Sequence, residues 1–266
     1  MKKRKHDRKR LNSKFAGLIL ITLIVVGVVV TFGLIPRIPQ WSSYHHFSDV
    51  RQWIGMPNFL NVVSNLLFIL MATLGFYSLG RQWRQKNLTN KELTVFFILF
   101  TGIFLIGFGS SYYHWSPDNA RLVWDRLPMT LIFMSLLSLT IMERVNFNLG
   151  FWLLIPLLAC GVFSVLYWYW SEISGHGDLR LYGLVQFYSV VLIVAILILF
   201  PKPYPPLKAY LWIIFFYSLA KLCEHLDVEI YNLDGIISGH SLKHIFAAMS
   251  TYGAVMMLNS KKTSES

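Results

Sequence analysis

The chain contains repeated apolar runs of about 20 residues, and this feature restricts its possible folds more than any other. A helix needs about 20 predominantly apolar residues to cross the hydrocarbon core of a bilayer. Of the 266 residues, 55% are hydrophobic and only 14% are charged, whereas soluble domains carry roughly 25% charged residues. We therefore expect an all-α integral membrane protein.

Eight such runs are present, and we expect each to form a transmembrane helix: 15–35, 58–80, 94–114, 122–142, 150–170, 181–200, 209–224 and 238–258. The first run follows the basic segment MKKRKHDRKR, as the core of a signal peptide would. It is longer than the roughly 7–15 residues of such a core, and no A-x-A cleavage site follows it. We interpret it as a retained anchor.

The basic residues predict the orientation of these spans. The net charge of +11 could indicate nucleic-acid binding, but the basic residues cluster beside apolar runs, which is typical of membrane topology. With the N-terminus in the cytoplasm, the inner segments carry 17 of the 24 Lys and Arg residues and the outer loops carry four. Because inner loops are enriched in Lys and Arg, we expect both termini in the cytoplasm and no nucleic-acid partner.

On this topology, seven of the eight histidines lie at the outer side of the membrane. His114 ends the span 94–114, whereas His240 and His244 begin the span 238–258. Asp125 lies near the outer start of the span 122–142. Groups from distant parts of the sequence are thus expected to share one depth of the membrane.

The residue types at this depth fit zinc chemistry. His240 and His244 are four residues apart, so both imidazoles point to one face of a helix. Together with His114 they make the three-nitrogen set of catalytic zinc, which leaves a fourth position for water. Bound zinc lowers the pKa of that water towards ~7 and polarises a carbonyl. Asp125 can accept the proton of the water, and Ser110, one turn before His114, can donate a hydrogen bond to a developing oxyanion.

The stretch GSSYYHWSPDNARLVWDRLPM resembles the signature of the alkaline ceramidase family: a Ser four residues before a His, an Asp eleven residues after that His, and then Leu-Pro-Met. Ser110, His114 and Asp125 have that spacing, and the later H-x-x-x-H matches His240 and His244. FLNVVSN resembles the first core helix of the family, with Asn61, Ser64 and Asn65 in its pattern. The amino-acid sequence of these stretches resembles the bacterial members of the family more than the eukaryotic ones.

The resemblance implies a seven-helix core over residues 44–258 that holds zinc on three histidines and hydrolyses the amide of ceramide or a related N-acyl lipid. The superfamily also contains the adiponectin and progestin receptors. Residues 15–35 are then an extra N-terminal transmembrane helix, preceded by a basic cytoplasmic segment (1–14), and residues 259–266 are a cytoplasmic tail. We expect the bacterial cytoplasmic membrane as the location, with the active site towards the outer face.

One part of the family pattern differs. Eukaryotic members carry an acidic calcium-binding cluster before the first core helix, but YHHFSDVRQW offers a single carboxylate, Asp49. Calcium takes six to eight oxygen ligands, so the sequence argues against a calcium site. His45 and His46 could lie near the mouth of the pocket, but we favour the interpretation that they are surface histidines.

Four further residues near the outer ends of spans have less specific interpretations. Glu224 and His225 could orient a zinc-ligating histidine or form an interfacial ion pair. Arg126 is expected to extend to the lipid headgroups, and Lys243 is expected to face away from the two histidines without a catalytic role.

Two other classes of function are compatible with parts of the sequence. A seven-helix sensor or scaffold could hold zinc structurally, but it would need neither Ser110 nor Asp125. A metal or proton transporter usually places polar groups near the midplane and on both sides of it, whereas here they gather at one end. The sequence does not reveal the acyl length, the headgroup or the oligomeric state.

Overall fold

The structure is a computed structural model that describes residues 2–261, and every regular element in this range is helical. The expected all-α class is therefore confirmed. The elements are α1 (Lys2–Gly33), η1 (Ser42–His45), α2 (Phe59–Val63), α3 (Leu66–Arg84), α4 (Asn90–Trp115), α5 (Asn119–Arg144), α6 (Phe147–Ile173), α7 (Arg180–Gly183), the π-helix η2 (Leu184–Tyr188), α8 (Ser189–Leu199), α9 (Leu207–His225), α10 (Asp227–Asp234) and α11 (Gly239–Asn259). Residues 262–266 of the expected cytoplasmic tail lie outside the described residues.

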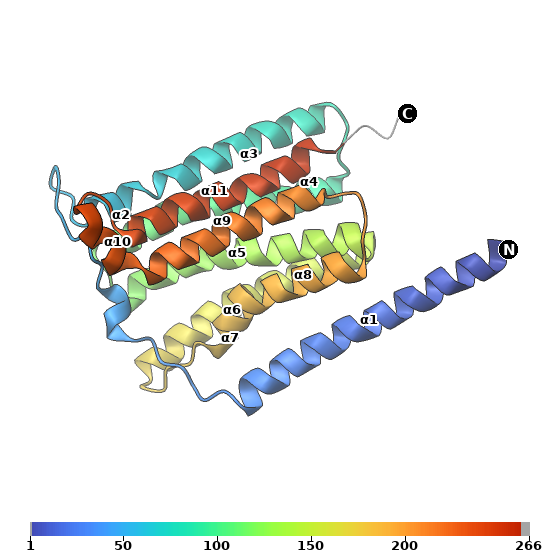
Figure 1. The fold of residues 1–266 in the computed structure, drawn as a ribbon, viewed down its shortest axis with the longest axis horizontal. Helices are drawn as coiled ribbons and strands as arrows, with labels where there is room; N and C mark the ends of the chain where they lie inside the picture. Colours follow the sequence, from blue (N-terminus) through green and yellow to red (C-terminus); the bar gives the residue numbers. More distant parts are fainter. Residues whose placement is uncertain (1, 262–266) are drawn as a thin grey trace.

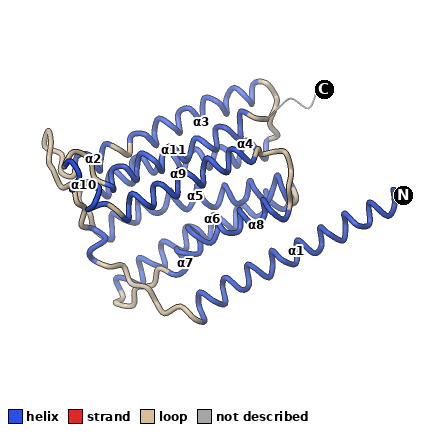
Figure 2. Tube along the Cα trace, viewed as in Figure 1, coloured by secondary structure: helices blue, strands red, loops and turns tan. Residues whose placement is uncertain are grey.

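The long helices pack side by side into one bundle, and their loops gather at its two ends (Figures 1 and 2). In this bundle α5 contacts α4 and α6, while α11 contacts α3 and α9. α1 runs along the edge of the bundle and contacts η2 and α8. The start of α1 and the end of α11 lie at one end, and α2, α10 and the segment 34–58 lie at the other (Figure 1).

Five helical stretches are long and apolar enough to cross a membrane, by length and composition: Phe59–Arg84, Asn90–Trp115, Asn119–Arg144, Phe147–Ile173 and Arg180–Leu199. All eight segments expected to span fall on helices. The apolar part of α1, Gly17–Gly33, is shorter. α9 and α11 have the length of a span, but their charged and histidine residues lower their hydropathy. The structure thus agrees with a membrane protein.

Two helix caps fix the ends of the helices that lie near the three histidines. The Asp118 side chain accepts a hydrogen bond from the backbone N of Arg121 (2.7 Å) at the start of α5. The Ser238 hydroxyl accepts from the backbone N of Ser241 (3.1 Å) at the start of α11. Such caps satisfy backbone N–H groups that the helix leaves free, so the first turns of α5 and α11 have defined positions.

Candidate metal centre

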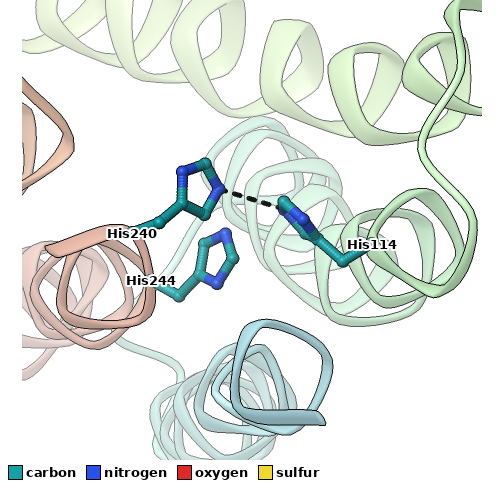
Figure 3. A group of neighbouring side chains, drawn as sticks. All are labelled: His114, His240 and His244. Carbon is teal, nitrogen blue, oxygen red and sulfur yellow. Dashed lines mark hydrogen bonds between the residues drawn. The ribbon is translucent and has the colours of Figure 1, made fainter. Parts of the chain in front are cut away.

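Three imidazoles meet at the end of the bundle where α2 and α10 lie. His114 comes from the last turn of α4, and His240 and His244 come from the start of α11 (Figure 3). All three are buried, and their candidate ligand nitrogens lie within 4.8 Å of one another. The Nε2 atoms of His114 and His240 are 3.4 Å apart. The sequence correctly predicted that the three side chains lie together; their role as metal ligands remains a prediction.

The start of α11 is held tightly against its neighbours. Asp227 Oδ1 accepts a hydrogen bond from the backbone N of His240 (2.6 Å). A Cβ on Gly239 would lie 2.2 Å from the carbonyl oxygen of Cys223, so only glycine permits this approach of α11 to α9. These contacts fix the position of the first turns of α11, and so the position from which His240 and His244 face His114.

Contacts from α2 orient the His244 ring. The Ser64 hydroxyl lies 2.8 Å from His244 Nδ1 and also donates to the carbonyl of Asn61 (3.3 Å). The tautomer of His244 that carries its proton on Nδ1 would donate to this hydroxyl and keep its lone pair on Nε2. His244 Nε2 is buried and has no hydrogen-bond partner, and the same is true of His114 Nδ1.

These observations fit a metal ion. A buried polar atom without a partner is costly, and an orienting hydrogen bond to one ring nitrogen is typical of a histidine whose other nitrogen binds a metal. Three neutral imidazoles are the donor set of catalytic zinc. His114, His240 and His244 therefore suit zinc in donor chemistry and burial.

Ser110 and Asp125 lie beside the histidines. Both are buried, and both line the same cavity as His244. A Cβ on Gly109 would lie 2.0 Å from the carbonyl oxygen of Trp124, so this glycine lets α4 and α5 approach closely. The close approach brings Ser110 and Asp125 together, and their catalytic roles remain a prediction.

A cavity of about 510 Å³ opens next to these residues. Ser110, Asp125 and His244 line its polar end, and η2, α8, α9 and the segment that follows α1 supply much of the remaining wall. A second, mainly apolar cavity of about 100 Å³ lies deeper in the bundle. The two share Phe68, Ile106, Met129, Tyr217 and Ala247 as lining residues. A polar end that continues into an apolar interior suits a molecule with one polar and one long apolar part.

Lys243 is placed differently from the expectation. Its Nζ lies 2.9 Å from His240 Nε2 and 3.2 Å from Glu224 Oε1, and the residue lines the large cavity. The expected orientation away from the histidines is wrong, because residues three apart lie on neighbouring positions of a helix surface. This spacing from His240 could have revealed Lys243 in the sequence.

Glu224 and His225 have different environments. Glu224 forms ion pairs with Lys221 (2.6 Å) and Lys243 (3.2 Å), so the alternative of an ion pair is correct for this residue. This ion pair lies in the wall of the cavity, because all three residues line it. His225 is exposed on α9.

Arg126 is also placed differently from the expectation. It is 5% exposed, and its guanidinium lies 4.1 Å from the ring centroid of Trp168 and 4.8 Å from that of Tyr182. Its Nη2 donates to Gln40 Oε1 (2.6 Å), and the residue lines the cavity. The expected extension to the headgroups is wrong, since two aromatic rings and an amide hold the side chain inside the bundle.

The segment 34–58 covers the histidines. Phe47 is buried, with its ring centroid 4.7 Å from that of His114 and 4.4 Å from that of His240. Sequence reasoning missed Phe47, because one phenylalanine in a loop belongs to no pattern. His45 is half-buried, bonded to the Tyr113 hydroxyl (2.9 Å) and Asn119 Oδ1 (3.0 Å), and burial lowers its pKa. His46 is exposed, as expected.

Asp49, the carboxylate at the position of the family's calcium cluster, forms an ion pair with Arg51. Arg51 Nε and Nη2 each lie 2.8 Å from one of its oxygens. Burial raises the pKa of Asp49, but the hydrogen bonds from Arg51 outweigh burial and hold this pKa below its ordinary value. A carboxylate in a bidentate pair with arginine is a poor candidate for a calcium ligand.

The comparison with known proteins agrees with the site. A family model described as Ceramidase matches residues 55–266, a range that contains all three histidines, Ser110 and Asp125. No curated protein and no solved structure matches the chain. The match leaves out α1 and most of the segment 34–58. The chain belongs to the ceramidase family, whose members are hydrolases of the amide bond of ceramide.

Proposed function

We propose that this protein is a zinc-dependent intramembrane amidase that hydrolyses the N-acyl amide of ceramide or a related lipid. The observation that carries the proposal is the meeting of three buried imidazoles with Ser110 and Asp125 at the polar end of a cavity. A purely structural zinc site, as in the alternative of a sensor or scaffold, has no need of an adjoining cavity or of a carboxylate.

The chain supplies a holder for the metal and groups that move protons. His114, His240 and His244 would hold zinc, which supplies a Lewis acid for the amide carbonyl and lowers the pKa of a nearby water. Asp125 accepts the proton of the attacking water on a carboxylate oxygen and then passes it to the leaving nitrogen. The oxygen of the water adds to the carbonyl carbon, and the C–N bond breaks to give a fatty acid and an amine.

Ser110 has two possible hydrogen-bond partners during this reaction. Its hydroxyl can donate to the neighbouring Asp125 and so orient the carboxylate. As the carbonyl oxygen gains charge, the same hydroxyl can turn and donate to it. The apolar interior beyond Met129 and Ala247 would receive the acyl chain and exclude water from the reacting bond.

We further propose eight spans with both termini in the cytoplasm and the histidines towards the outer face of a bacterial cytoplasmic membrane. The distribution of Lys and Arg supports this orientation. The beginning of α1 and the end of α11 lie at the end of the bundle opposite the histidines, as an even number of spans requires (Figure 1).

The decisive experiment measures zinc and hydrolysis on the same purified protein. We expect one zinc per chain by elemental analysis, release of fatty acid from an N-acyl lipid, loss of both with a chelator and recovery with zinc. His114→Ala should lose most of the zinc, whereas His225→Ala, a control on an exposed histidine, should keep it. A parent without zinc contradicts the metal site, and a zinc-loaded parent that releases no fatty acid contradicts the amidase.

A further inference from the structure

The side chains that line the large cavity carry more positive than negative charge. Lys221, Lys243 and Arg126 line it together with only two carboxylates, Asp125 and Glu224. A further cation in the wall, Arg180, is neutralised by Asp178, which lies outside this set, at 2.7 Å. One positive charge is therefore left over among the lining residues of the described chain. Arg126 is 5% exposed, and among the described residues it contacts an amide and aromatic rings without an ion pair to a carboxylate. A buried charge without such a partner is strongly destabilising.

The guanidinium of Arg126 has an unused donor. Nη2 is bonded to Gln40, but Nη1 is buried and has no hydrogen-bond partner. The group lies between the rings of Tyr44, Trp168 and Tyr182, which fix its position. A fixed planar guanidinium with a free N–H is suited to bind a carboxylate, sulfonate or phosphate.

The two lysines compete for one acceptor. Lys221 Nζ lies 2.6 Å from Glu224 Oε2, and Lys243 Nζ lies 3.2 Å from Glu224 Oε1. A single carboxylate neutralises only one of the two ammonium groups. The other close partner of Lys243 is His240 Nε2, and that nitrogen has one lone pair, which a bound metal would occupy. With a metal in place, Lys243 keeps only its bond to the shared Glu224 carboxylate, so two of its three N–H donors are available to another acceptor.

We propose that the cavity selects an N-acyl lipid whose head carries an anionic group close to the amide, held by Arg126 and Lys243. This inference rests on the proposed amidase function and names its substrate class. The head of ceramide offers only neutral hydroxyl groups, which cannot compensate the extra charge, whereas a carboxylate, sulfonate or phosphate can. Hydrolysis adds water across the C–N bond and releases a fatty acid and an amine that keeps the anionic group.

The test compares lipids that differ in charge and share an acyl chain. N-oleoylglycine and N-oleoyltaurine are compared with neutral N-oleoylethanolamine, and ceramide 1-phosphate with ceramide, on the zinc-loaded full chain in neutral detergent. We expect kcat/KM to favour the anionic member by about 10–100-fold, the worth of a charge-assisted hydrogen bond. The best anionic lipid identifies the source, an acylated amino acid or sulfonic acid or a phosphorylated sphingoid base. A parent that cleaves the neutral lipids equally fast or faster overturns the inference and leaves the amidase intact.

Variants of Arg126 test whether this residue causes the preference for anionic lipids. Arg126→Met should reduce the ratio of anionic to neutral kcat/KM to near one, and Arg126→Lys should retain part of it. Arg121→Met is the matched control, because Arg121 pairs with Asp118 and does not line the cavity. An unchanged ratio in Arg126→Met, or an equal loss of ratio in the control, contradicts the assignment.

A binding measurement separates this inference from the amidase proposal. N-oleoylglycine should raise the Tm of the zinc-loaded protein more than N-oleoylethanolamine does, and Arg126→Met should abolish the difference. If this result appears while no lipid is cleaved, the anion site stands and the amidase fails. Equal Tm shifts by the two lipids in the parent contradict the anion site.

Discussion

At the scale of single residues, a substitution of Asp125 tests the proposed catalytic role separately from metal binding. Asp125→Asn keeps size and polarity but removes the proton acceptor, and the three imidazoles are untouched. We expect zinc to stay bound and hydrolysis to fall by about 10²–10⁴-fold, the usual contribution of a positioned general base. Elemental analysis and a fatty-acid release assay measure the two quantities.

Ser110→Ala serves as the comparison for Asp125→Asn, and we expect it to reduce hydrolysis by a smaller factor. If Asp125→Asn keeps both zinc and nearly full activity, the role given to Asp125 is wrong. If zinc is lost with Asp125→Asn, the residue supports the metal instead of accepting a proton.

The Asp49–Arg51 pair predicts a dependence of stability on pH. Because the pKa of Asp49 in the folded protein lies below its ordinary value of 3.8, the charged carboxylate stabilises the fold above that pH. The contribution is lost as the pH falls through the lowered pKa. Asp49→Asn should therefore lower Tm at pH 7, and the difference from the parent should shrink below about pH 4. Thermal unfolding at a series of pH values tests this, and a difference that grows towards acid contradicts it.

Part of the site could be predicted from residue spacing, and part could not. The spacing of four between His240 and His244 and between Ser110 and His114 is a property of one helix, so the sequence was sufficient there. Arg126 and Phe47 depend on tertiary contacts. Arg126 is held by rings from α6 and α7, and Phe47 lies in a loop that folds over His114 of α4 and His240 of α11. No local pattern contains that information.

At the scale of helices, the close contact of α4 with α5 has a testable consequence. Even the methyl group of Gly109→Ala would collide with the carbonyl of Trp124, so the two helices must separate. We expect hydrolysis to fall by at least about tenfold, because small misplacements of reacting groups are costly. Gly80→Ala, at a helical position with open space around it, is the control and should keep full activity.

The existence of the helices was easier to predict than their membrane role. Long runs such as those of α4 and α6 are apolar on all sides, so composition alone identifies them. α9 and α11 carry Lys221, Glu224, His240 and Lys243, because they form the site, and the same residues weaken the signal of a span. The π-helix η2 at the cavity was not predicted, since a local change in helical register leaves no periodic mark in the sequence.

At the scale of the whole molecule, the proposed orientation predicts which loops an impermeant reagent reaches. Starting from a background with Cys160→Ser and Cys223→Ser, His46→Cys should be labelled from outside intact cells, and Leu88→Cys should be labelled only after the membrane is opened. The reverse pattern would overturn the orientation and place the histidines in the cytoplasm. The measurement is thiol labelling with a membrane-impermeant maleimide.

The wall of the cavity comes from two parts of the chain with different relationships to the family. Thr31, Ile35 and Ile38 lie before residue 55, outside the family match, yet they line the same cavity as Asp125 and His244. Arg180 Nη1 bonds the carbonyl of Ile35 (2.9 Å) and so ties the two parts together. In evolutionary terms, selection can replace the amino-terminal part of this wall and change which lipid fits while the chemistry of the inherited bundle stays the same.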